Sequence, residues 1–320
     1  MEAPVPSLAS TGYHQPVMLR ESVDALSIRP SGTYVDVTFG GGGHSCEILR
    51  HLGPEGRLYA FDQDLDAQVN IPDGEERLTF VQSNFRYLAN WMRYYGEEGI
   101  DGLIADLGVS SHHFDDETRG FSFRFDAPLD MRMNGRGGMT AADVLHRYDE
   151  VQIERVLRLY GEVHNARRMA AAIVRRRTES PIARVGDLLQ VLKPFVPAAH
   201  EKKELARIFQ ALRIEVNHEL DALPEMLNAA CKLLRPDGRL VVLTYHSLED
   251  RIVKNFLRSG NSEGEIEKDF FGRFTAPLTA VGKALSPSAT EQAENPRSRS
   301  AKLRIGKKNA TEANTANKTH

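Results

Sequence analysis

Along the first hundred residues, short apolar runs alternate with segments whose apolar residues recur every three or four positions. Four runs rich in β-branched and aromatic residues predict buried strands, at 34–39, 58–62, 78–82 and 102–106. Segments between them, such as 45–52, have the spacing of amphipathic helices. Strands separated by helices predict a parallel sheet, which binds ligands at the carboxyl ends of its strands.

The first of these predicted strands leads directly into four consecutive glycines, Gly40 to Gly43. A residue without Cβ lets the backbone turn sharply and touch a ligand, so this strand, turn and helix predict half of a nucleotide-binding βαβ unit. The second strand ends about 20 residues on, at Asp62, where a carboxylate can hold both ribose hydroxyls. A flexible surface turn would also contain glycines, but the flanking elements and the acid favour a nucleotide site.

The spacing of the glycines narrows the class of nucleotide. The dinucleotide pattern G-x-G-x-x-G fails, because Ser45 stands where its third glycine belongs. Asp36, Gly40 and Gly42 fit the looser D-x-G-x-G-x-G pattern of class I S-adenosylmethionine methyltransferases. Thr38 replaces the first glycine of that pattern. The turn therefore favours S-adenosylmethionine over a nicotinamide cofactor.

A glycine or a polar residue stands at or just after the end of each of the four predicted strands: Gly43, Asp62, Asn84 and Asp106. The carboxyl ends of parallel strands share one edge of a sheet, so we expect these positions to line one crevice. Phe85 comes directly after Asn84. Its aromatic ring suits contact with an adenine and suits a core position at the start of a helix equally well.

The alternation stops after Asp106. Residues 107–137 form a long polar stretch with interspersed phenylalanines and arginines, which favours a functional loop over an aromatic-poor disordered segment. Apolar stripes at helical spacing then predict helices around 153–160, 185–192 and 205–216. The expected fold class is therefore α/β, a Rossmann-like sheet with an inserted all-helical domain.

These patterns give the expected domain boundaries. Residues 1–112 and 216–306 would form the α/β domain, 113–215 the loop and helical insertion, and 307–320 a disordered tail. We expect the insertion to recognise the substrate.

Two later segments complete the predicted α/β domain. Residues 239–244 form an apolar strand, and 300–305 predict a last one. Ser247 is expected to cap the helix that follows the first of these strands, with Asp250 three residues on as the second member of a capping box.

One helix of the insertion carries five arginines: Arg167, Arg168, Arg175, Arg176 and Arg177. They lie opposite an apolar face, and Glu179 is the acid close to them in sequence. Such a face is either an ordinary solvated surface or a contact surface for phosphates. The arginine excess favours the phosphates.

Composition adds limits to this picture. The chain has 320 residues, 41% of them hydrophobic, and a net charge of −3, so RNA binding requires a local basic patch. No apolar run approaches the roughly 20 residues of a membrane span, and we expect a cytoplasmic protein.

Cys46 and Cys231 lie in apolar helical patterns and are interpreted as small buried residues. No metal cluster is expected, because His112 and His113 are adjacent and cannot readily chelate as an i, i+4 pair would.

Seven short blocks stand out along the chain: Thr38–Ser45, Asp106–Ser111, Arg119–Phe123, Pro128–Met133, Phe209–Ile214, His246–Arg251 and Asn295–Ser300. Their content and order resemble the signatures of the bacterial small-subunit rRNA cytosine-N4 methyltransferases. The match runs from His14 to about Ile305. Seven blocks in the right order are far more specific than the glycine turn alone.

This resemblance implies a Rossmann-like methyltransferase domain with S-adenosylmethionine as the donor. It implies a decoding-region cytidine of 16S rRNA, in the small ribosomal subunit, as the substrate. It implies a donor site lined by Gly41, Gly42, Gly43, His44, Asp62, Phe85 and Asp106. The family commonly has a glutamine where this chain has His113, and a neutral imidazole can donate or accept at that contact but not both. The resemblance leaves the oligomeric state, monomer or homodimer, open.

Methylation of the exocyclic N4 amine requires a hydrogen-bond acceptor, because the amine lone pair is shared with the cytosine ring. An acceptor on N4–H localises that pair while the amine is aligned with the methyl group. Asp106 is the best-placed carboxylate, and Asp130 and His246 are weaker candidates. We also hypothesise that Phe121 or Phe123 holds the target base out of its stack.

Two other functions fit parts of the sequence. An RNA- or ribosome-binding assembly factor could keep this fold and hold the donor only as a structural ligand. The intact glycine turn with Asp62 and Asp106 favours the enzyme instead. A nicotinamide oxidoreductase is a third alternative, which Ser45 disfavours.

Overall fold

The computed structural model describes residues 16–109, 116–266, 268, 270–272, 274 and 276–310. The chain divides into two compact units: residues 1–108 with 221–320, here the sheet unit, and residues 109–220, here the helical unit. Among the described residues, no helix is both long and apolar enough to cross a membrane.

Seven strands form the sheet of the sheet unit: β1 (Thr33–Asp36), β2 (Arg57–Asp62), β3 (Leu78–Gln82), β4 (Ile100–Asp106), β5 (Leu234–Thr244), β6 (Leu278–Ala280) and β7 (Lys302–Lys308). Their order is β3-β2-β1-β4-β5-β7-β6; β1 to β5 pair in parallel, and β7 is antiparallel to β5 and β6. The expected α/β fold class is confirmed. The strand order reverses between β1 and β4, and α/β proteins bind ligands at such a switch point.

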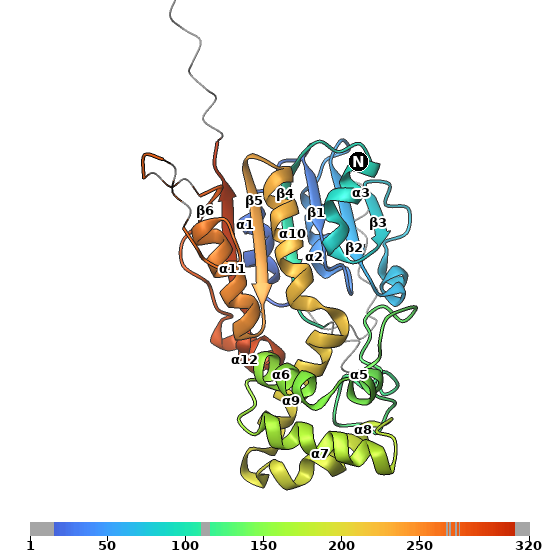
Figure 1. The fold of residues 1–320 in the computed structure, drawn as a ribbon. Helices are drawn as coiled ribbons and strands as arrows, with labels where there is room; N and C mark the ends of the chain where they lie inside the picture. Colours follow the sequence, from blue (N-terminus) through green and yellow to red (C-terminus); the bar gives the residue numbers. More distant parts are fainter. Residues whose placement is uncertain are drawn as a thin grey trace, which may run out of the picture. The chain divides into compact units, whose positions relative to one another are not determined.

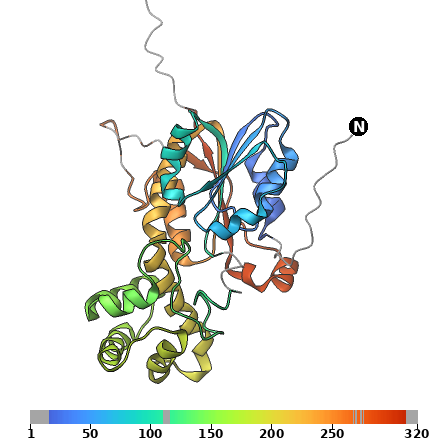
Figure 2. The same cartoon turned by 90° about the vertical axis from the view of Figure 1, so that its right-hand side faces the viewer.

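Helices cover both faces of this sheet: α1 (Leu19–Leu26), α2 (Gly43–His51), α3 (Leu88–Tyr94), α10 (Glu219–Leu233) and α11 (Ser247–Ser259). Side chains alternate along a strand, so Leu103 and Ala105 of β4 pack in the core shared with α3, α10 and α11. Ile104 packs in the core shared with α1 and α2. Figures 1 and 2 show these two helical layers on opposite faces of the sheet.

Shorter elements connect and close the sheet unit: η1 (Leu65–Asn70), η2 (Phe85–Tyr87), α12 (Ala289–Glu294) and η5 (Pro296–Ser300). Cys231 is buried as expected, whereas the prediction for Cys46 is wrong in degree, because its side chain is only partly buried. β5 begins five residues before the predicted 239–244 strand, and the Pro-Asp-Gly sequence at 236–238 lies inside it. Asp237 has a φ of 67° there, and the pairing with β4 shifts register.

The helical unit contains five helices within its described residues: α5 (Ala141–Arg147), α6 (Glu150–Gly161), α7 (Ala166–Glu179), α8 (Val185–Leu192) and α9 (Glu201–Asn217). Two short 3-10 segments, η3 (Lys193–Phe195) and η4 (Ala198–His200), join α8 to α9. The three helices predicted from apolar stripes are α6, α8 and α9. Their buried side chains share one hydrophobic core.

The irregular segment that precedes α5 is packed against the same core. Phe121 is 4% exposed and Met131 is completely buried. Stacking of a substrate base on Phe121, one of our hypotheses, is therefore wrong for this conformation, because the ring is enclosed by core side chains. Phe123 is partly buried with its ring edge-on to Phe209. The apolar residues of this segment serve mainly to anchor it.

Candidate functional site

The carboxyl ends of β1, β2, β4 and β5 bring together a group of residues that we call the strand-end site: Asp36, Thr38, Gly40 to His44, Asp62, Asp106 and Tyr245. All of them belong to the sheet unit. They converge because parallel strands end at one edge of the sheet.

The glycine turn is tied to the end of β2. Gly40 and Gly42 adopt left-handed backbone conformations, with φ of 50° and 75°, which glycine reaches without strain. The Gly40 amide donates a hydrogen bond to Asp62 Oδ2 at 2.8 Å. The other carboxylate oxygen, Oδ1, accepts from the Asp64 amide at 2.8 Å. Asp62 is thereby oriented by backbone amides and, being a carboxylate, keeps acceptor capacity for ribose hydroxyls.

The glycines of this turn have different reasons to lack a side chain. A Cβ on Gly43 would lie 2.1 Å from Cγ of Pro16, and one on Gly42 would lie 3.1 Å from the Phe39 ring. These two glycines make room for the chain itself. Gly40, Gly41 and Gly43 are each partly exposed, whereas Gly42 is buried, so a ligand can approach the turn on either side of Gly42.

A chain of hydrogen bonds links the ends of β1 and β4. The Asp106 amide donates to Thr38 Oγ1 at 2.6 Å, and the Thr38 amide donates to Asp36 Oδ1 at 3.0 Å. The Ser45 hydroxyl donates to Asp36 Oδ2 at 2.7 Å. Burial raises the pKa of Asp36, although these donors and His44 oppose the rise. Thr38, the departure from the glycine pattern, thus supplies the hydroxyl that fixes the end of β4.

Asp106 has a carboxylate in an unusual setting. Its Oδ1 accepts a hydrogen bond from the Tyr245 hydroxyl at 2.7 Å, and 23% of the side chain remains exposed. Burial raises its pKa to about 7, with the negative charge of Glu249 adding to the rise and the Tyr245 hydrogen bond opposing it. A carboxyl group with this pKa exchanges its proton near neutrality, as a general base or a strong acceptor must.

His44 lies beside this carboxylate. Its Nδ1 is 3.8 Å from Asp106 Oδ2, and its side chain is almost completely buried. Burial lowers the pKa of His44, although the nearby Asp36 charge opposes that change. The imidazole is therefore neutral at pH 7 and does not form a permanent ion pair with Asp106.

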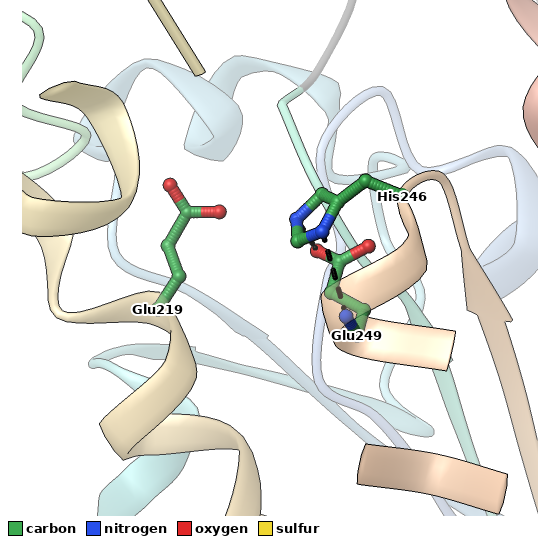
Figure 3. Close-up of side chains that lie close together, drawn as sticks. All are labelled: Glu219, His246 and Glu249. Carbon is green, nitrogen blue, oxygen red and sulfur yellow. Dashed lines mark hydrogen bonds and ion pairs between the residues drawn. The ribbon is translucent and has the colours of Figure 1, made fainter. Parts of the chain in front are cut away.

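His246 begins α11 next to Glu249, as Figure 3 shows. Its Nδ1 accepts a hydrogen bond from the Glu249 amide at 3.4 Å, and its Nε2 lies 3.1 Å from Glu249 Oε1. His246 is thus the N-cap, and the prediction that Ser247 caps this helix is wrong. Asp250, the expected partner in that cap, instead pairs with Arg304 on β7. The local pattern misplaced the cap by one residue and could not show that Arg304, 54 residues away, holds the Asp250 carboxylate.

Phe85 lies at the start of η2, where its ring is partly buried against the core of the sheet unit. The preceding residue, Asn84, donates from Nδ2 to Gln63 Oε1 at 3.0 Å. Gln63 follows Asp62 directly, so this contact joins the ends of β2 and β3. Both interpretations of Phe85 remain predictions, and Gln63 is a polar residue at this end of the sheet that the sequence analysis did not single out.

The remaining predicted site residues lie elsewhere. Asp130 belongs to the helical unit, where its carboxylate is held by Arg132 through two hydrogen bonds of 2.7 Å. Burial alone would raise the pKa of Asp130, but the Arg132 hydrogen bonds hold it below the usual value. His113, together with His112, lies outside the described residues.

The five arginines of α7 fall into two groups. Arg176 donates to the Ser180 carbonyl at 2.7 Å, and Arg177 donates to the carbonyls of Leu145 and Tyr148 at 2.6 Å each. These two side chains close the helix end and tie α7 to α5. The exposed group is Arg167, Arg168 and Arg175, of which Arg168 also lies over the Phe195 ring.

Tyr245 and Glu249 are the members of this network that the sequence did not single out for chemistry. Tyr245 is 139 residues from Asp106, and no local pattern predicts a contact over that separation. One sequence signal did point to this region: the block His246–Arg251, one of the seven that carry the family resemblance, begins immediately after Tyr245.

Residues 11–309 match a family model described as the MraW methylase family. A protein of Parabacteroides distasonis is 61% identical over 298 residues, covering 92% of this chain and 97% of that protein. A protein of Phocaeicola vulgatus is 59% identical over 297 residues, with coverage of 92% and 97%. One of Flavobacterium johnsoniae is 51% identical over 297 residues, with coverage of 92% and 98%. Each of the three is named "Ribosomal RNA small subunit methyltransferase H".

Proposed function

This chain belongs to the MraW methylase family, and from that premise we propose that it methylates the exocyclic N4 of a cytidine in the decoding region of 16S rRNA. S-adenosylmethionine is the methyl donor, and the small ribosomal subunit in the cytoplasm is the partner. The names of the relatives support a ribosomal RNA substrate, and the seven sequence blocks support the cytosine-N4 specificity.

The observation that carries this proposal is the carboxylate of Asp106 at the switch point of the sheet. It lies at the end of β4, linked through Thr38 to β1 and close to the glycine turn. Its raised pKa makes it a better proton acceptor than an ordinary aspartate. An amine nucleophile that must lose its proton during methyl transfer needs such a group.

The residues around the glycine turn fit the donor. Asp62 would hold the ribose hydroxyls, and the partly exposed Gly40 and Gly41 let a ligand approach the backbone. The start of α2 adds a positive helix end nearby. When bound, S-adenosylmethionine supplies an electrophilic methyl group on a positively charged sulfur.

Asp106 would act on the nucleophile. Its carboxylate would accept a hydrogen bond from N4–H, which localises the amine lone pair for attack, and would take the proton as the new N–C bond forms. The neutral His44 beside it leaves this charge available for the substrate. Positioning and electrostatics would then carry most of the rate enhancement, because no covalent intermediate with the protein is needed.

We assign substrate recognition to the helical insertion. The exposed arginines of α7, Arg167, Arg168 and Arg175, would contact RNA phosphates. Phosphate contacts of this kind position a nucleic acid without reading its sequence, so the target cytidine would be selected at the strand-end site and by the shape of the ribosomal RNA.

The test is methyl transfer from tritium-labelled S-adenosylmethionine to purified small subunits that lack the modification, followed by nucleoside analysis. The proposal expects label in N4-methylcytidine and loss of that label when Asp106 is replaced by asparagine. Label in another nucleoside would reject the assigned position. Stable binding of subunits and donor without any transfer would identify an assembly factor instead.

A further inference from the structure

The Asp106 carboxylate has two oxygens in different surroundings. Oδ1 accepts the Tyr245 hydroxyl at 2.7 Å. Within the described residues Oδ2 receives no hydrogen bond, and His44 Nδ1 lies 3.8 Å from it. The Tyr245 contact therefore fixes the orientation of the carboxylate and directs the other oxygen toward whatever occupies the site.

Tyr245 is itself held from two sides. A Cβ atom on Gly108 would be 3.4 Å from the Tyr245 ring, so the ring packs against the backbone that follows β4. Behind it, Glu249 Oε2 accepts a hydrogen bond from the Tyr245 amide at 3.0 Å. Burial, together with the Asp106 charge, raises the pKa of the Tyr245 phenol well above its usual value, so the phenol stays protonated and serves as a donor.

Glu249 connects this tyrosine to His246. Its side chain is 3% exposed; one oxygen holds the Tyr245 amide and the other lies 3.1 Å from His246 Nε2 (Figure 3). A buried glutamate fixes two successive residues at the start of α11. One of them contacts Asp106, the proposed acceptor, and the other was a candidate for the same role.

We propose that Tyr245 is a positioning residue for methyl transfer, which aims the free oxygen of Asp106 at the substrate amine, and that Glu249 holds Tyr245 in place. This inference rests on the proposed function, because it takes Asp106 as the acceptor. It goes further by assigning roles to two residues whose contribution acts through Asp106.

Tyr245 and Glu249 have opposite electrostatic effects on Asp106, so removing each of them should shift the pKa of Asp106 in opposite directions. The Tyr245 hydrogen bond stabilises the carboxylate, whereas the Glu249 charge destabilises it. His44 and Asp36 also face this group and stay unchanged in the experiment. Removing the Tyr245 hydroxyl should raise the pKa of Asp106, and neutralising Glu249 should lower it.

The experiment measures single-turnover methylation of small subunits against pH for the wild type, Tyr245→Phe and Glu249→Gln. On the acid limb, Tyr245→Phe should be about ten- to a hundredfold slower, the scale of one lost hydrogen bond to a charged group. At alkaline pH, where Asp106 is ionised in both proteins, the ratio should fall to a smaller and constant value, which measures the lost orientation of the carboxylate alone. The Glu249→Gln limb should move toward lower pH. Tyr59→Phe, which removes a 2.8 Å hydrogen bond to Glu97 in the same unit, is the matched control and should leave the limb in place.

Carbon-13 NMR titration of the Asp106 carboxyl, assigned by its loss in Asp106→Asn, follows the same shifts without activity. Opposite displacements in both measurements support the inference. An unchanged titration in Tyr245→Phe overturns it, and so does a shifted titration with a rate ratio that is uniform across pH. If the Asp106 carboxyl of the wild-type protein titrates near pH 7 but the protein methylates no cytidine, the proposed function is rejected instead.

Discussion

Asp106 and Asp130 are both aspartates that the sequence analysis named as candidate acceptors. Their surroundings shift their pKa values in opposite directions. In the sheet unit, Asp106 accepts a hydrogen bond from the neutral Tyr245 phenol. Burial raises its pKa to about 7, and the negative charge of Glu249 adds to that rise, while the Tyr245 hydrogen bond opposes it. In the helical unit, Asp130 is gripped by the guanidinium of Arg132, and its pKa lies below the usual value.

The difference separates a carboxylate available for chemistry from one committed to structure. A guanidinium fork supplies two charge-assisted hydrogen bonds and removes most of the basicity of its partner. A phenol orients a carboxylate while leaving its charge to interact with a substrate. The acceptor at a reacting amine should therefore be Asp106, and Asp130 should hold the loop before α5 in shape.

The largest expected effect tests this assignment directly. Asp106→Asn keeps the size of the side chain and one acceptor oxygen but removes the charge, and should lower single-turnover methylation by about 10²-fold or more. Donor affinity, measured by calorimetry, should fall much less. Asp130→Asn, the matched substitution in the other unit, should change the rate only modestly. A reversed order of the two effects would transfer the acceptor role to Asp130.

A third carboxylate, Asp62, sharpens the comparison because backbone amides orient it. Asp62→Ala should weaken S-adenosylmethionine binding by about 2 kcal/mol, or about thirtyfold, since a ribose hydroxyl loses its partner. Asp62→Asn, which preserves one acceptor, should lose less. Asp73→Ala, at an exposed acid 11 residues further along the chain, is the control for calorimetry. Wild-type affinity in a folded Asp62→Ala variant would remove this residue from the donor site.

The arginines of α7 show a similar contrast, because some are exposed and others are bonded to backbone carbonyls. Replacing Arg167, Arg168 and Arg175 with glutamine should weaken RNA binding by about tenfold and lower its salt slope by roughly 0.7 to 0.9 for each lost phosphate contact. Arg177→Gln should instead destabilise the fold, because two carbonyls lose their donor. Filter binding at several salt concentrations distinguishes the two groups, and an unchanged slope in the triple variant would return these arginines to an ordinary solvated surface.

The smallest effect concerns stability and pH. Since the folded-state pKa of Asp106 is raised to about 7, its contribution to stability is present below its unfolded pKa and is lost as pH rises through 7. Asp106→Asn should therefore gain about 1 kcal/mol relative to the wild type between pH 5 and pH 6 in urea unfolding. For Asp130, whose pKa is lowered, the sign is opposite: its contribution is lost as pH falls. Equal pH dependence in Asp106→Asn and the wild type would contradict the raised pKa.

Much of the fold follows from local patterns. The strands ending at Asp62 and Asp106, the glycine turn between β1 and α2, and the helices α6, α8 and α9 were all predicted from periodicity and turn residues. Hydrophobic spacing is set by the repeat of the backbone itself, so it survives in the sequence whatever surrounds the element.

What the sequence by itself determined is that the strands ending at Asp62 and Asp106 belong to one parallel sheet, and therefore that these two acids share one edge of it. Only the tertiary structure decided that the pKa of Asp106 is raised. Burial is the main cause, the Glu249 charge adds to the rise and the Tyr245 hydrogen bond opposes it; these two partners lie 143 and 139 residues away along the chain. Burial and long-range partners set a pKa, and neither leaves a periodic trace in the sequence.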